Sequence, residues 1–159
     1  MAPRSRWLDL KIPPVLVLAV MALAMSASGL LFPALSIPLH APVRLVAASG
    51  IALCGALACL AGVLAFRKAG TTVNPLTPQS VSCFVAGGIY RYSRNPMYLG
   101  FLLTLTGLAL YLGNALGAIF PILFVLYMNR FQIAPEEDFL AARFGAAYRT
   151  YCESVPRWI

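Results

Sequence analysis

Three long apolar stretches dominate the chain, and the short segments between them carry nearly all of its charge. The first stretch has no charged residue over residues 12–43, and the second has none over residues 45–66. A helix needs about 20 predominantly apolar residues to cross a hydrocarbon core of about 30 Å. The pattern therefore predicts two membrane-spanning helices, over residues 13–35 and 44–66.

The third apolar stretch is too long for one membrane crossing. It contains 35 uncharged residues, from 95 to 129, and a single helix of that length would be about 52 Å long. Gly113 and Asn114 suit the backbone conformations of a tight reversal. We therefore expect a helical hairpin, with membrane spans at 96–112 and 115–131.

Composition supports a membrane protein and excludes several other classes. Hydrophobic residues make up 60% of the 159 residues and charged residues only 11%, against about 25% charged in an average soluble domain. Mean hydropathy is +0.81. Soluble, disordered and disulfide-scaffold classes are excluded by this balance. The four cysteines are too widely spaced for a zinc pattern, and we expect no metal site.

The distribution of basic residues predicts the orientation in the membrane. With four spans, eleven of the twelve Lys and Arg residues fall on one side, and only Arg44 falls on the other. Basic residues favour the cytoplasmic side, so both termini are expected there. Because these residues flank apolar segments and form no continuous stripe, the net charge of +7 indicates membrane topology and no nucleic-acid binding.

Two polar segments remain on the cytoplasmic side. Residues 67–95 form a loop with turn-forming and basic positions. Residues 134–155 are expected to form an amphipathic helix that begins near Pro135, which suits a first helical turn. The expected fold is thus a single all-α, polytopic membrane domain over residues 1–159, with four transmembrane helices and a cytoplasmic amphipathic C-terminal helix.

The hairpin should bring the two polar segments together. Taken alone, basic and tyrosine residues anchor helix ends at a membrane interface, and Glu136 and Glu137 are favourable at a helix N-terminus. Both segments nevertheless adjoin the open end of one hairpin. Together they could bind a ligand that has a carboxylate and an ammonium or sulfonium group, with arginine facing the first and glutamate the second.

The residues of these segments resemble the isoprenylcysteine carboxyl methyltransferase family and its phospholipid methyltransferase relatives. The resemblance covers about residues 67–159. It rests on the string Gly87-Gly88-Ile89-Tyr90-Arg91-Tyr92-Ser93-Arg94-Asn95-Pro96-Met97-Tyr98-Leu99-Gly100, on Pro135-Glu136-Glu137 with Leu140 and Phe144-Gly145, and on Tyr148, Tyr151 and Val155-Pro156.

The resemblance implies an integral membrane methyltransferase that uses S-adenosylmethionine, held on the cytosolic side between the hairpin ends and the C-terminal helix. It implies roles at the reacting centre for Arg94 and Asn95, and contact with the acceptor for Gln132 and Arg130. The residues that it implies for cofactor binding are Ser82, Cys83, Phe84, Val85, Gly88, Tyr90, Arg94, Asn95, Pro96, Met97, Tyr98, Glu136 and Glu137.

Two positions depart from the family pattern. Asn95 stands where the family has histidine, and an amide cannot titrate near neutral pH, so a histidine base at this position is excluded. Gln132 stands where a family arginine contacts the prenylcysteine carboxylate. This neutral residue weakens the case for a carboxylate-bearing acceptor.

Other functions stay open at this stage. The resemblance extends loosely to sterol reductases that use NADPH, and the motif could also serve as an anchor in a non-catalytic membrane interaction module. The expected partners are the lipid bilayer and a lipophilic small-molecule acceptor, and the expected location is a bacterial inner membrane or its equivalent. The sequence does not identify the acceptor, the methylated atom or the oligomeric state.

The charge asymmetry gives a testable topology. Single cysteines introduced into a cysteine-free background should react with a membrane-impermeant reagent from the cytoplasmic side at Gly70, and from the other side in the 113–114 turn. Cytoplasmic labelling of the turn, or external labelling at Gly70, would rule out four spans with both termini inside.

Overall fold

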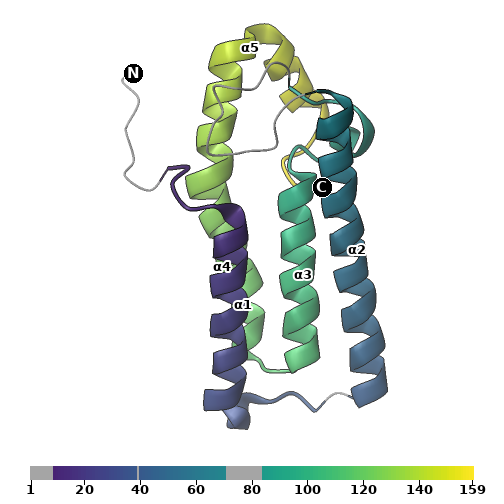
Figure 1. Ribbon diagram of the computed structural model, residues 1–159. Coiled ribbons are helices and arrows are strands. Elements are labelled where there is room, and N and C mark those ends of the chain that lie inside the picture. Colours follow the sequence, from purple (N-terminus) through teal and green to yellow (C-terminus); the bar gives the residue numbers. More distant parts are fainter. Residues whose placement is uncertain (1–8, 39, 71–83) are drawn as a thin grey trace.

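The computed structural model describes residues 9–38, 40–70 and 84–159, and their regular structure is helical. Figure 1 shows the arrangement of the elements. In chain order they are α1 (Pro14–Leu31), η1 (Pro33–Leu35), α2 (Ala41–Lys68), η3 (Gly88–Arg91), α3 (Pro96–Leu112), η4 (Leu116–Ala118), α4 (Ile119–Met128), the π-helical η5 (Asn129–Ile133) and α5 (Ala134–Ser154).

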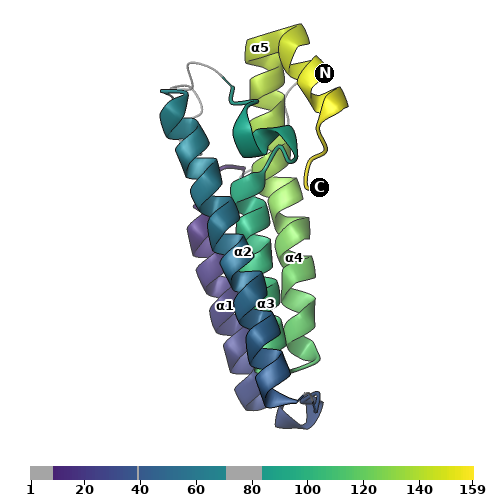
Figure 2. The same ribbon diagram turned by 90° about the vertical axis from the view of Figure 1, so that its right-hand side faces the viewer.

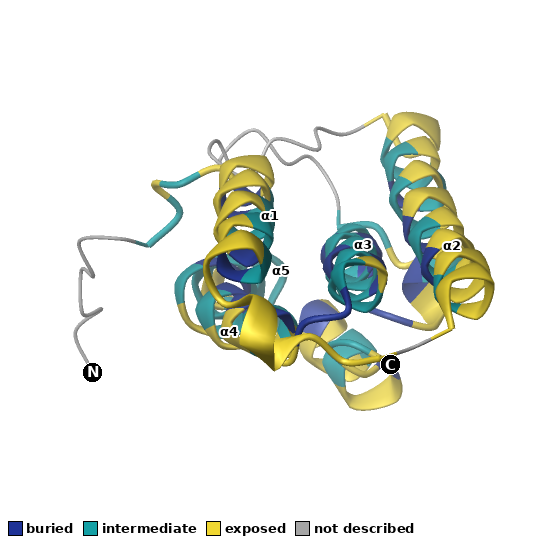
Figure 3. Cartoon of the chain, turned by 90° about the horizontal axis from the view of Figure 1, so that it is seen from below, coloured by how far each residue is buried: buried dark blue, intermediate teal, exposed yellow. Residues whose placement is uncertain are grey.

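Helices α1 to α4 form one bundle in which α3 is central. Seen along the bundle, α2 flanks α3 on one side, and α1 and α4 lie on the other (Figure 3). Buried residues such as Met25, Leu105 and Phe124 meet between the helices, while the outward faces carry exposed Leu and Val side chains. An apolar exterior around a small buried core is typical of a bundle in lipid.

The helices match a polytopic membrane protein in length and composition. Within the described residues, α1, α2 and the continuous helix of residues 116–154 are long and apolar enough to cross a membrane, and α3 is a shorter apolar helix. Helices α3 and α4 form the expected hairpin (Figure 1). The all-α, polytopic fold class predicted from the sequence is confirmed.

The reversal of the hairpin is built from Gly113 and Asn114. Gly113 has a φ of 59°, a left-handed conformation that favours glycine. The Asn114 side chain accepts a hydrogen bond from the backbone N–H of Leu116 and donates one to the carbonyl of Phe32, both at 3.0 Å. The turn is therefore fixed to the end of α1. Ala115 is exposed and is the better position for a topology probe.

The fourth span and the C-terminal helix form one continuous helix. The sequence pattern predicted two helices, with a break at residues 132–133. Pro135 has no N–H to donate to the carbonyl of Phe131, one turn earlier. That carbonyl accepts the backbone N–H of Leu10 at 3.1 Å. The π-helical turn over Asn129–Ile133 widens the backbone just before the proline. The helix therefore continues from the bundle into α5, which extends beyond the bundle and bends near its middle (Figure 2).

Glycines let α2 and α3 approach closely. A Cβ atom on Gly55 would lie 2.6 Å from the carbonyl oxygen of Gly100, and one on Gly107 would lie 2.8 Å from that of Ala48. Small residues are characteristic of helix interfaces in membranes, because backbone approach increases van der Waals contact. Gly50 lies on α2, as Gly55 does, but faces outward. A Cβ atom on Gly50 would have no neighbouring atom within 4 Å.

This difference predicts opposite effects of the same substitution on one helix. Gly55→Ala should lower the thermal unfolding midpoint, by an overpacking cost of about 1–3 kcal/mol. Gly50→Ala is the matched control and should be neutral or slightly stabilising, because alanine favours a helix over glycine by about 1 kcal/mol. Thermal unfolding in detergent, followed by circular dichroism, measures both. Equal midpoints for the two variants would contradict the close approach at Gly55.

Candidate functional site

The polar residues of the site gather at the end of the bundle where α3 and α5 begin. Pro96 is the first residue of α3 and is fully buried. The preceding turn, η3, places Tyr90 in the interior, where its ring packs edge-on against Phe66 with centroids 5.4 Å apart. The Tyr151 hydroxyl of α5 donates a hydrogen bond to the Tyr90 carbonyl at 2.7 Å. The start of α3 is thus held against α2 and α5.

Glu136 lies against the first turn of α3. Its carboxylate accepts a hydrogen bond from the hydroxyl of Tyr98 at 2.6 Å. Burial raises the pKa of Glu136 to about 7, with a further upward effect of Glu137, while the Tyr98 hydrogen bond acts in the opposite direction. No ion pair to Glu136 occurs among the described residues. A half-buried carboxylate without a cation is unfavourable, so the position favours a positively charged ligand.

Glu137 contacts a different set of partners. It forms an ion pair with Arg94 at 3.3 Å. It also accepts two hydrogen bonds from Arg157, at 3.2 Å from Nε and at 2.5 Å from Nη2. One carboxylate thus joins the residue that precedes α3 to the end of the chain.

The C-terminal tail packs back onto the same motif. The backbone N–H of Arg94 donates to the carbonyl of Pro156, and the Asn95 side chain donates to the carbonyl of Arg157, both at 3.0 Å. The Trp158 indole N–H donates to Asn129 Oδ1 in the π-helical turn, also at 3.0 Å. The amide that replaces the family histidine therefore binds the tail.

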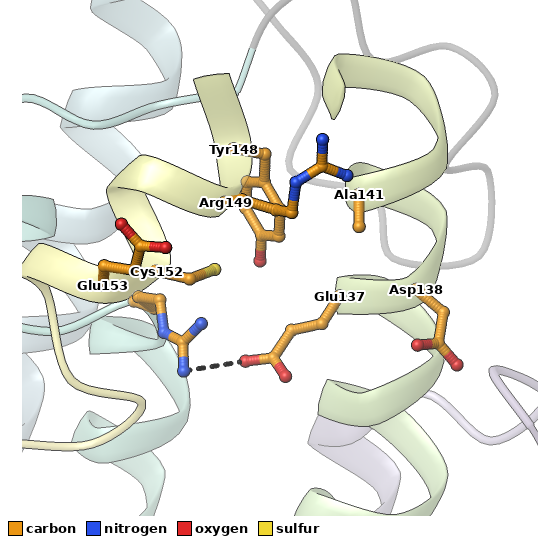
Figure 4. Close-up of a pocket in the computed structure, with 8 residues that line it drawn as sticks. Glu137, Asp138, Ala141, Tyr148, Arg149, Cys152 and Glu153 are labelled. Carbon is orange, nitrogen blue, oxygen red and sulfur yellow. Dashed lines mark ion pairs between the residues drawn. The ribbon is translucent and has the colours of Figure 1, made fainter. Parts of the chain in front are cut away.

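A cavity of about 420 Å³ lies beside this cluster, within the usual range for small-molecule sites of about 300–1,000 Å³. Its walls come from the two arms of α5, which face each other across the bend at Gly145 (Figure 4). Gly145 has a φ of 57°, so the bend suits glycine. The lining residues are Arg94, Glu137, Asp138, Ala141, Tyr148, Arg149, Cys152 and Glu153.

Arg94 has an unused donor at this cavity. Its Nε atom is buried and has no hydrogen-bond partner among the described residues. A buried donor without a partner is unfavourable, and a ligand oxygen would satisfy it. Glu136 without a cation and Arg94 with a free donor together fit a ligand that carries both signs of charge.

The structure places the residues predicted from the sequence in three groups. Arg94 and Glu137 line the cavity. The predicted residues that are outside its lining but lie in the same two segments, residues 84–98 and the start of α5, are Phe84, Val85, Gly88, Tyr90, Asn95, Pro96, Met97, Tyr98 and Glu136. Phe84 packs against Phe144, Tyr148 and Tyr151, with centroids 5.3–5.6 Å apart. Val85 and Gly88 lie in the segment that leads into Tyr90, with Gly88 at a φ of 62°. Ser82 and Cys83 lie outside the described residues.

The two residues expected to contact the acceptor lie away from the cavity lining. Gln132 is fully buried in the π-helical turn, where its Nε2 donates to the carbonyl of Ile12 at 2.6 Å. Its Oε1 has no partner among the described residues. Arg130 is exposed, with its guanidinium 5.3 Å from the centroid of the Phe131 ring. Their part in acceptor binding stays a prediction.

Several residues at the site were not predicted from the sequence. Cavity-lining positions fall four residues apart along α5, as in the pairs Tyr148–Cys152 and Arg149–Glu153. That spacing marks a shared helix face and could have indicated them. The contribution of Arg157 and Trp158 had no local signal, because it depends on the return of the tail.

The fold and the site define an integral membrane protein with a polar cavity at one end of an apolar bundle. The model of the phospholipid methyltransferase family matches residues 43–147, which include the glycine contacts of α2, the start of α3 and the glutamates of α5. The chain therefore belongs to the phospholipid methyltransferase family.

Individual relatives agree with this assignment. Protein-S-isoprenylcysteine O-methyltransferase of Schizosaccharomyces pombe is 37% identical over 78 residues, and protein-S-isoprenylcysteine O-methyltransferase A of Arabidopsis thaliana is 39% identical over 74 residues. These matches cover 47% and 45% of this chain but only 32% and 36% of the two relatives. The resemblance to the isoprenylcysteine carboxyl methyltransferases is confirmed.

A bacterial relative matches over its full length. An uncharacterized protein of Haemophilus influenzae is 48% identical over 63 residues, which are 40% of this chain and 100% of that protein. No solved structure matches the chain.

The raised pKa of Glu136 predicts how stability depends on pH. The folded protein keeps a proton that the unfolded chain releases above the ordinary pKa of 4.5. The contribution of Glu136 to the free energy of unfolding should therefore fall as the pH rises from about 4.5 to about 7, by up to about 3 kcal/mol. Thermal unfolding in detergent at pH 5 to 8 measures this. Glu136→Gln should remove that part of the decline and be more stable than the wild type at pH 8.

Glu137→Gln is the control for this experiment. It should lose ion pairs with two arginines and should keep the Glu136 part of the decline. If wild type and Glu136→Gln lose stability equally with rising pH, Glu136 does not have the raised pKa.

Proposed function

We propose that this protein is an integral membrane methyltransferase that uses S-adenosylmethionine and acts on a lipophilic acceptor. The observation that carries the proposal is the combination, at the starts of α3 and α5, of a carboxylate without a cation and an arginine with one unpaired donor. Glu136 has no cation among the described residues, and the Nε of Arg94 has no acceptor there. Membership of the phospholipid methyltransferase family supports the reaction type.

The residues present fit the charges of S-adenosylmethionine. This cofactor carries a carboxylate, an ammonium and a sulfonium, and the sulfonium supplies the methyl group. In our proposal Arg94 binds the carboxylate, and Glu136 neutralises positive charge beside Tyr98. Tyr90 and Tyr98 are buried, with 5% and 8% of their surfaces exposed.

The protein contributes mainly position and exclusion of water. Displacement of a methyl group from a sulfonium disperses charge at the transition state, so an aligned, desolvated arrangement supplies much of the rate. An acceptor that is already a carboxylate, thiolate or amine needs no strong base. Asn95 could not provide one, and its amide is engaged by the carbonyl of Arg157.

The acceptor is proposed to reach the site from the bilayer. Helices α1, α2 and α4 expose many large apolar side chains, and the site lies at one end of the bundle that they form with α3. The two named relatives are protein-S-isoprenylcysteine O-methyltransferases, so an S-isoprenylated cysteine is one acceptor of the proposed lipophilic class. We further propose that both termini face the cytoplasm and that the membrane is a bacterial inner membrane or its equivalent.

Ligand binding tests the proposal directly. Titration calorimetry on detergent-purified protein should show binding of S-adenosylmethionine and S-adenosylhomocysteine and none of NADPH. Glu136→Gln should weaken S-adenosylmethionine binding by about 1–3 kcal/mol, the cost of a hydrogen bond lost from a charged group. Glu137→Gln is the matched neighbour and should have a smaller effect, because Glu137 already has two arginine partners.

The control for folding is the far-ultraviolet circular dichroism of each variant, which should equal that of the wild type. Binding of NADPH in place of S-adenosylmethionine would indicate a reductase. Binding of neither would indicate a non-catalytic module. Equal losses for the two glutamate variants would contradict the role given to Glu136.

A further inference from the structure

The C-terminal tail, residues 155–159, contacts Arg94 and Asn95, the two residues of the proposed cofactor site that directly precede α3. Backbone carbonyls of Pro156 and Arg157 accept hydrogen bonds from Arg94 and Asn95. Trp158 is bonded to Asn129 in the π-helical turn, and Val155 is buried with 7% of its surface exposed. The tail therefore bridges α3, the π-helical turn and α5.

Arg157 and Arg94 share one carboxylate. Glu137 contacts Arg157 through both of its oxygens and contacts Arg94 through one. Two-point pairing of an arginine with a carboxylate is stronger and more directional than a single contact. Arg157 therefore holds the Glu137 carboxylate in a fixed orientation, which leaves the Nε of Arg94 without a partner among the described residues.

We propose that Arg157 is a positioning residue that keeps Glu137 from saturating Arg94, so that Arg94 can bind the carboxylate of the cofactor. This inference rests on the proposed function. Without Arg157, Glu137 is free to pair fully with Arg94 and to compete with the ligand carboxylate for the same guanidinium. Arg157 then acts on cofactor affinity through Glu137, without contact with the reacting atoms.

The proposal predicts that a second substitution, at Glu137, restores the ligand affinity that substitution of Arg157 lowers. Arg157→Gln should weaken binding of S-adenosylhomocysteine by about tenfold, equivalent to about 1.4 kcal/mol. Adding Glu137→Gln removes the competing carboxylate, so the double variant should recover most of the affinity. A merely structural role for Arg157 predicts that the double variant binds no better than Arg157→Gln.

Calorimetry on four detergent-purified proteins tests this: wild type, Arg157→Gln, Glu137→Gln and the double variant. Arg157→Lys should bind with intermediate affinity, because lysine keeps the charge but lacks the two-point geometry. Arg91→Gln, at an exposed arginine close in the sequence, is the control and should bind as the wild type does. Turnover should show a raised KM for the cofactor in Arg157→Gln with kcat nearly unchanged.

Failure of this inference is distinguishable from failure of the proposed function. If wild type binds S-adenosylhomocysteine and Arg157→Gln binds equally well, or if the double variant binds no better than Arg157→Gln, the role of Arg157 is wrong while the methyltransferase stands. If wild type does not bind the ligand, the proposed function is wrong and this inference falls with it. Should Arg157→Gln fail to fold, the comparison of Arg157→Lys with and without Glu137→Gln makes the same test.

Discussion

Charged groups are too costly to leave in hydrocarbon, and this constraint organises the rest of the molecule. The helix of residues 116–154 contains 39 residues, and at 1.5 Å per residue its path through the bend at Gly145 is about 58 Å, nearly twice the thickness of a bilayer core. Its apolar part packs in the bundle, so its acidic part must project beyond it. The same boundary falls at the start of α3, where Arg94 precedes the first apolar turn. Both signs of charge therefore meet at one end of the bundle.

Glu136 and Glu137 are adjacent in the chain, but their different surroundings give the two carboxylates different properties. Glu136 faces Tyr98 and, among the described residues, no cation, and burial raises its pKa to about 7. Glu137 faces Arg94 and Arg157. An unpaired carboxylate lowers the stability of the folded protein without ligand, and binding of a cationic ligand can restore that stability. Such arrangements are more common at functional sites than at structural ones.

The backbone irregularities of the last helix lie where this site is built. Pro135 leaves the Phe131 carbonyl to the N–H of Leu10, the π-helical turn places Gln132 in the interior, and Gly145 bends α5 so that its two arms face each other. Wide helical turns occur frequently at functional sites. Here they direct a helix that leaves the membrane back over the end of α3, where the cavity forms.

The sequence by itself determined the all-α fold, the apolar helices and the end of the bundle that carries the charge, because these follow from the length and placement of apolar runs. Gly113 and Asn114 marked the reversal through local backbone preference, and the motif around Tyr98 and Glu136 pointed to a shared site. Only the tertiary structure decided which glutamate faces Tyr98 and which faces the arginines. Adjacent residues on a helix point about 100° apart, and the rotation of α5 about its axis depends on packing against α3. The return of Arg157 and Trp158 was equally hidden, since it rests on hydrogen bonds between residues 29 to 62 positions apart in the chain, which no local pattern encodes.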